Sequence, residues 1–188
     1  VTVSTAALLM ISQSDNTATD LLIRAVGRGR VERYAPDSHP VLTTREFFLL
    51  KADSQAEDRT AYLRGSVQQK RDVLDDLDGE LPPASLFTGG PVHSRIEWFI
   101  STADLAGLIE EIERTDILAV NPGPIEPTQW DEWGYKGGSE PGVLNMTVRL
   151  VSKDGDRFAV SATQNRTDTD VDASAFLSTF QTVLAQLD

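Results

Sequence analysis

The clearest signal of the fold lies in residues 133–164, which read WGYKGGSEPGVLNMTVRLVSKDGDRFAVSATQ. Three runs within this stretch, 133–138, 143–152 and 157–164, have strand-like composition and are separated by turn residues. Asp154-Gly155 connects the last two runs and is a typical hairpin sequence. The stretch therefore predicts a three-stranded antiparallel meander.

Helical patterns dominate the chain before this meander. Residues 17–26 carry apolar side chains on one helical face and stop at Gly27, and Thr43 with Glu46 forms a capping box for the next apolar helix. A further helix begins at Ser101 and is expected to end near residue 115. After the meander, one helix closes the chain with the apolar stripe Phe176, Phe180, Val183, Leu184 and Leu187.

This order of elements predicts an α+β fold, with helices first, then antiparallel strands, then a C-terminal helix. Residues 1–118 form the mainly helical region, and residues 119–188 form the sheet and the closing helix. The chain opens at Val1 without an initiator Met or a signal peptide, so we expect it to be part of a longer protein.

Composition excludes several classes of function. The formal net charge of −12 argues against nucleic acid and against an anionic membrane surface as partners. No apolar run is long enough to form a transmembrane segment, and there is no cysteine for a disulfide or a thiolate zinc site. The two histidines, His39 and His93, stand alone, so we expect neither a metal site nor a cofactor.

Two short polar motifs are the candidates for chemistry: Ser14-Asp15-Asn16 and Lys136-Gly137-Gly138. A serine hydroxyl beside a lysine ammonium can pass a proton to a leaving group, and an Asn amide can hold an acyl carbonyl. Glycines on a strand let a ligand approach the backbone, and the N–H of Ser139 can serve as an oxyanion donor. Taken singly, the motifs also suit helix capping and a plain turn.

The wider segments around both motifs resemble the class A β-lactamases and penicillin-binding serine hydrolases. Residues 10–22, MISQSDNTATDLL, are similar to the Ser-Asp-Asn segment, and residues 135–143, YKGGSEPGV, to the Lys-Thr-Gly strand. Thr43-Thr44 is similar to the start of the helix that follows in that family. The similarity extends to the branch that includes the serine hydrolase domain of the clavulanic acid cluster and related actinobacterial lipoproteins.

The resemblance implies a fold and a function. Residues 1–188 would be the C-terminal part of one β-lactamase/transpeptidase-like domain that lacks the N-terminal strands. The activity would be hydrolysis of an ester, amide or β-lactam-like acyl compound through an acyl-enzyme. Ser14 and Lys136 would be catalytic, and Asn16, Gly137, Gly138 and Ser139 would bind the substrate.

Departures from the family pattern qualify this expectation. No Ser-x-x-Lys occurs in the chain, so the nucleophile is expected upstream of Val1 and residues 1–188 alone should be inactive and unlabelled by acylating probes. Gly137 replaces a hydroxyl residue, and the segment between Gly27 and Thr43 is too short for the usual deacylating loop. Glu32, its one glutamate, is interpreted as a solvated surface residue. An esterase or peptidase-like reaction therefore fits better than efficient β-lactamase activity.

Several alternatives stay open at this stage. The chain could be a non-catalytic binding or structural protein on the same scaffold. Trp130 or Trp133 could border a substrate cleft or simply pack in the core. Family members carry further strands beside the last strand of the sheet, so the missing N-terminal segment or a second chain is expected to cover an open sheet edge. The parent protein is expected to be secreted or lipid-anchored.

Overall fold

The computed structural model describes residues 1–88 and 90–187. Within it the chain forms two compact units. One contains residues 1–10, 15–88 and 92–100, and the other contains residues 11–14, 90–91 and 101–187. Among the described residues, every helix is too short or too polar to cross a membrane. The prediction of one domain over residues 1–188 stays a prediction.

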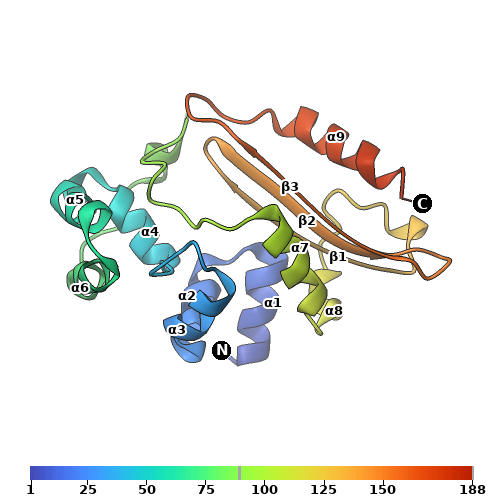
Figure 1. Ribbon diagram of the computed structural model, residues 1–188, viewed down its shortest axis with the longest axis horizontal. Coiled ribbons are helices and arrows are strands. Elements are labelled where there is room, and N and C mark those ends of the chain that lie inside the picture. Colours follow the sequence, from blue (N-terminus) through green and yellow to red (C-terminus); the bar gives the residue numbers. More distant parts are fainter. Residues whose placement is uncertain (89, 188) are drawn as a thin grey trace. The chain divides into compact units, whose positions relative to one another are not determined.

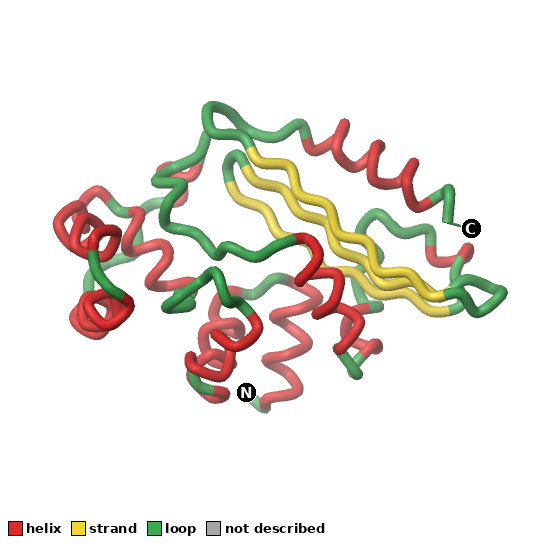
Figure 2. The backbone as a smooth tube through the Cα atoms, in the orientation of Figure 1, coloured by secondary structure: helices red, strands yellow, loops and turns green. Residues whose placement is uncertain are grey.

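The sheet unit is built on the predicted meander. Strands β1 (Glu132–Glu140), β2 (Val143–Val151) and β3 (Arg157–Asn165) pair antiparallel in the order β1-β2-β3. They lie side by side in Figure 2. Gly142 and Gly155 have φ of 80° and 90° in the two connections, a conformation that costs glycine little. The predicted strands are confirmed, each reaching one or two residues beyond or short of its expected end.

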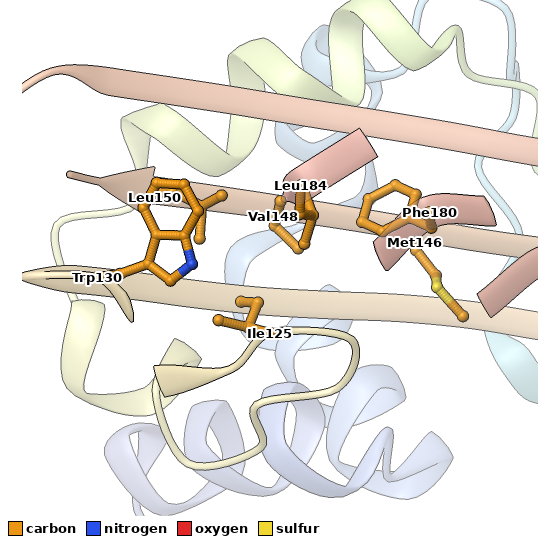
Figure 3. Close-up of a cluster of buried hydrophobic side chains, with 7 residues drawn as sticks. All are labelled: Ile125, Trp130, Met146, Val148, Leu150, Phe180 and Leu184. Atoms are coloured by element: carbon orange, nitrogen blue, oxygen red, sulfur yellow. The ribbon is translucent and has the colours of Figure 1, made fainter. Parts of the chain in front are cut away.

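One face of the sheet is apolar and packs against helix α9 (Ala173–Leu184). Alternate residues of β2 point to this face, because side chains alternate along a strand. Figure 3 shows this cluster, in which Phe180 and Leu184 of α9 meet the strand side chains. Its buried members are Ile125, Trp130, Met146, Val148, Leu150, Phe180 and Leu184.

The opposite face of the sheet meets helices α7 (Thr102–Glu111) and α8 (Thr115–Leu118), with α7 and α9 on opposite sides in Figure 1. The guanidinium of Arg149 on this face donates to the carbonyl of Ile112, 3.1 Å away. A Cβ at Gly134 would lie 2.9 Å from Cβ of Leu118, so α8 packs directly on the backbone of β1. Ser101, where the helix is predicted to begin, is the N-cap of α7, but the helix ends at Glu111, before residue 115.

The helical unit holds most of the remaining helices around a second core. Helix α4 (Thr44–Lys51) has the capping box expected from Thr43 and Glu46. The core of the helical unit combines α4 with α5 (Ala56–Arg64), α6 (Val67–Asp76) and a later segment. Its buried members are Leu42, Phe47, Leu50, Tyr62, Leu74 and Ile96. The α-helices of this unit are α1 (Val3–Gln13), α2 (Asn16–Val26), α3 (Arg28–Val31), α4, α5 and α6, and its 3-10 turns are η1 (Glu32–Tyr34), η2 (Asp53–Gln55) and η3 (Ala84–Phe87). The last turn of α1 and the 3-10 turn η4 (Pro127–Gln129) belong to the sheet unit.

Candidate active site

The structure brings Ser14 and Lys136 together although 122 residues separate them. Nζ of Lys136 donates to Oγ of Ser14 at 2.6 Å and also to the carbonyl of Gly137. Both residues belong to the sheet unit. Lys136 is half-buried, and this burial lowers the pKa of its ammonium group. The pair therefore offers an exposed hydroxyl hydrogen-bonded to an amine that gives up its proton more readily than a solvated lysine.

Local backbone geometry presents the Ser14 hydroxyl. Helix α1 ends at Gln13, and Ser14 has φ of 52°, in the left-handed region that few non-glycine residues adopt. The next residue, Asp15, caps helix α2 by accepting from the N–H of Ala18 at 2.6 Å. Within the motif, Asp15 is thus a capping residue, while Ser14 is left free to interact with the lysine.

Lys136 lies on the polar face of the sheet, beside a network of hydroxyl and amide groups. It pairs in register with Thr147, which in turn pairs with Ser161. Their hydroxyls are 2.8 Å apart. Asn145 accepts from Thr147 at 3.0 Å and donates to Ser161 at 3.3 Å and to Thr163 at 2.8 Å. This network is not predicted from the sequence, where its only signal is polar residues at alternate positions of the two strands.

The roles of the remaining predicted site residues stay predictions. Gly138 and Ser139 are exposed on β1, and Gly137 is half-buried beside them. Asn16 is the exposed first residue of α2 and belongs to the helical unit, whereas the other predicted site residues belong to the sheet unit. Its role in holding an acyl carbonyl therefore rests on the sequence resemblance.

The interpretation of Glu32 as a solvated residue is wrong. Glu32 is 5% exposed and accepts from Arg71 at 2.6 Å and from the N–H of Val41 at 3.2 Å. Burial alone would raise the pKa of this carboxyl, but the hydrogen bonds from Arg71 and Val41 and the charges of Arg71 and His39 lower it overall. A carboxylate held in this way is a poor proton acceptor.

One further ion pair and its hydrogen bonds hold the segments around this carboxylate in the helical unit. Arg28 makes a two-pronged contact with Glu46 at 2.6 and 3.0 Å and also donates to the carbonyl of Val41. Glu46 is also the acceptor for the N–H of Thr43 in the capping box. The segment between α2 and α4 is therefore pinned at several points.

Trp130 and Trp133 pack in the core of the sheet unit. Trp130 is 3% exposed and meets Phe158 edge to face, and Trp133 packs against the same cluster. Of the two alternatives that the sequence leaves open for Trp130, packing in the core is therefore the one that the structure supports. Trp98 is 40% exposed but stacks on Phe47 and donates to the carbonyl of Leu42 at 2.9 Å.

Comparison with known proteins gives the family. A model of the beta-lactamase enzyme family, Beta-lactamase2, matches residues 1–119. None of the curated proteins matches the chain.

Solved β-lactamase structures have a similar fold. The β-lactamase from Streptomyces albus G aligns at 17% identity and a TM-score of 0.58, covering 100% of this chain and 64% of that one. The β-lactamase from Sphaerobacter thermophilus DSM 20745 aligns at 21% identity and 0.52, covering 94% and 59%. An ancestral (GNCA) class A β-lactamase aligns at 14% identity and 0.56, covering 100% and 66%.

The chain thus spans less than two thirds of the length of the first two of these proteins. At such identities the solved structures establish the fold, and the family model establishes the relationship. The chain belongs to the beta-lactamase enzyme family and has the fold of the class A β-lactamases.

Proposed function

We propose that the intact gene product is a serine hydrolase of the β-lactamase and penicillin-binding type. It acts on an ester, amide or β-lactam-like acyl substrate through an acyl-enzyme, and it needs no cofactor. The observation that carries this proposal is the 2.6 Å contact between Nζ of Lys136 and Oγ of Ser14. The nucleophile comes from a segment outside residues 1–188, since the chain has no Ser-x-x-Lys and aligns with 64% of a solved relative.

The proposed steps assign one role to each residue. A serine hydroxyl from the outside segment attacks the acyl carbon, and its proton passes to the lysine of its own motif. The bond to the leaving nitrogen or oxygen breaks as Ser14 gives that atom its proton, and Lys136 replaces the proton on Ser14. Water then cleaves the acyl-enzyme and releases the acid.

Other site residues bind the substrate in this scheme. The amide of Asn16 holds the substrate carbonyl, and the N–H of Ser139 stabilises the oxyanion. Gly137 and Gly138 present backbone that the substrate can approach closely, because they carry no side chain. Secretion or lipid anchoring of the parent protein belongs to the same proposal and rests on the family resemblance.

Substitution at the pair tests the scheme. In the intact gene product, Ser14→Ala and Lys136→Ala should each lower the rate of acylation by a chromogenic ester by about 10²–10⁴-fold, the usual contribution of a proton-transfer group. Ser178→Ala and Lys70→Ala are matched controls, because none of their described interactions involves Ser14 or Lys136. Unchanged rates in the first two variants would refute the assignment.

A covalent probe separates this proposal from its alternative. The alternative, a non-catalytic binding protein on the same scaffold, is suggested by the missing Ser-x-x-Lys. Labelling of the intact gene product by fluorescent penicillin or a fluorophosphonate supports the enzyme. Absence of labelling by both probes favours the binding protein.

The edge of the sheet suggests a partner. Among the described residues β3 pairs only with β2, so its nine residues leave one row of backbone groups without a strand partner. Unpaired edges of this length invite pairing with another strand. We propose that the segment outside residues 1–188, or a second chain, covers β3.

A further inference from the structure

Two Asp-Gly sequences occur in the chain, Asp78-Gly79 and Asp154-Gly155. In such a pair the backbone nitrogen of the glycine can attack Cγ of the preceding aspartate, because glycine has no Cβ to hinder the approach. The attack closes a five-membered succinimide ring, and water reopens that ring to aspartate or to isoaspartate. The sequence makes both pairs equal candidates for this backbone change, and the structure distinguishes them.

At Asp78-Gly79 the reacting groups are already in contact. Oδ1 of Asp78 accepts a hydrogen bond from the N–H of Gly79 at 2.7 Å, so the carboxyl group is folded against the nitrogen that attacks it. The Asp78 side chain is 95% exposed and follows the end of helix α6, outside any helix or strand. Holding two reacting groups together in this way lowers the entropic cost of the reaction.

Two side chains of the helical unit bind this dipeptide in a way that favours the attack. Gln55 donates to the carbonyl of Asp78 at 2.6 Å, and this carbonyl belongs to the same peptide group as the N–H of Gly79. Because hydrogen bonds polarise a peptide group, this contact makes the N–H more acidic. Arg45 donates to the carbonyl of Gly79 at 2.7 Å and lies 3.6 Å from Oδ1 of Asp78. Its charge can therefore stabilise the negative charge that develops on the carboxyl oxygens during the attack.

Asp154-Gly155 has a different arrangement. The N–H of Gly155 donates to the carbonyl of Ser152 at 3.0 Å, in the connection between β2 and β3. The N–H of Asp156 donates to Oγ of Ser152 at 3.0 Å and closes the same turn. Both glycines have positive φ, 135° at Gly79 and 90° at Gly155, so the glycine conformation does not separate the two pairs. The nitrogen of Gly155 must leave a turn hydrogen bond before it can attack, whereas that of Gly79 already contacts the carboxyl group.

We propose that Asp78-Gly79 is a site of spontaneous backbone isomerisation, at which isoaspartate forms without an enzyme. A base in the solvent takes the proton of the Gly79 nitrogen, the nitrogen bonds to Cγ of Asp78, and one carboxyl oxygen leaves as water. Water then adds to the former main-chain carbonyl carbon of Asp78, and the bond from that carbon to the Gly79 nitrogen breaks. The chain now runs through the Asp78 side chain, with one more methylene in its backbone and no net change in mass.

Isomerisation changes how this segment is held. The Asp78 carbonyl that accepts from Gln55 becomes a free carboxylate, and the added methylene shifts the Gly79 carbonyl that accepts from Arg45. Arg45 lies in α4 and Gln55 in η2. The contacts that tie residues 78–79 to these two elements are therefore altered together.

Ageing of the intact gene product at neutral pH tests the proposal. Peptide mapping by mass spectrometry, with fragmentation that separates isoaspartate from aspartate, follows both positions over several weeks. Isoaspartate should accumulate about 10-fold faster at Asp78 than at Asp154, because a hydrogen bond that must first be released slows a reaction by up to about that factor. Equal rates at the two positions, or a faster rate at Asp154, would overturn the proposal.

Asp78→Asn and Asp154→Asn give a second readout. An asparagine at either position reacts through the same ring and releases ammonia, so the product differs in mass from the starting protein. In the folded protein Asp78→Asn should deamidate about 10-fold faster than Asp154→Asn. In urea the two variants should react within about 2-fold of each other, because the contacts of the fold are gone. A 10-fold difference that persists in urea would show that the local sequence sets the rates, which would end the structural explanation.

Discussion

The side chain of Tyr135 fills a slot that Gly123 and Gly137 leave open: an added Cβ would lie 2.3 Å from the ring at the first and 2.1 Å from the hydroxyl oxygen at the second. This slot makes a sharp prediction about stability. Gly137 and Gly138 are neighbours on β1, but an added Cβ meets Tyr135 at the first and nothing within 4 Å at the second. Gly137→Ala should therefore destabilise the protein, whereas Gly138→Ala should not. The pair of variants adds the same atoms to adjacent residues of one strand, so propensity effects cancel to first order.

The magnitude follows from two opposing contributions. Alanine in a strand is favoured over glycine by roughly 0.5–1 kcal/mol, which both variants gain. Overpacking at Gly137 costs about 1–3 kcal/mol, because the hydroxyl oxygen stands 2.1 Å from the new Cβ. Moving the ring away would cost free energy, because it lies close against Gly123 and packs against the hydrophobic cluster beside α9. The variants should thus differ by about 2 kcal/mol.

Thermal unfolding measures this difference. About 2 kcal/mol corresponds to a melting temperature roughly 4–8 °C lower for Gly137→Ala than for Gly138→Ala in a chain of this size. Adding Tyr135→Val to both variants removes the obstructing ring, and the difference should then largely disappear, as a double-mutant cycle requires for residues in contact. Equal melting temperatures for the two single variants would show that no slot constrains position 137.

Two further predictions concern the ion pair and the sheet edge. Arg71→Met should lower the free energy of unfolding, measured in urea at pH 7, by about 2 kcal/mol, because Glu32 stays buried without the guanidinium that pairs with it. The loss is moderate because Arg71 is partly exposed. The pKa of Glu32 is lower in the folded protein than in the unfolded chain. The stabilisation that this carboxylate contributes is therefore fully present above the unfolded-state pKa and is lost as the pH falls through the folded-state pKa. The gap between wild type and Arg71→Met should therefore shrink below about pH 4, and a constant gap would contradict the assignment. Residues 1–188 expressed alone should self-associate in sedimentation velocity through the open edge of β3, whereas a monomer that unfolds cooperatively would refute that expectation.

The sheet could be predicted from the sequence because its signals are local. The three strands alternate in composition, and glycines mark both connections, so pattern and turn chemistry agree. The juxtaposition of Ser14 and Lys136 is not a local property. It followed only from the resemblance of two segments to one family, since spacing alone does not relate residues 122 positions apart.

The errors and omissions share one cause. Glu32 looked like a surface residue because its partner Arg71 lies 39 residues further along the chain. The hydroxyl network depends on register, which sets Thr147 opposite Ser161 and cannot be read from either strand by itself. The slot around Tyr135 likewise depends on Gly123, a residue in a loop before the strand. Tertiary neighbours decide each of these features.

The interlocking of Gly123, Tyr135 and Gly137 has an evolutionary consequence. A mutation that places a side chain at either glycine first meets the aromatic ring, and loss of the ring leaves a void beside two bare backbones. The three positions should therefore covary among homologues: lineages with an aromatic residue at 135 should keep both glycines, and lineages with threonine or serine at 137 should have a small residue at 135.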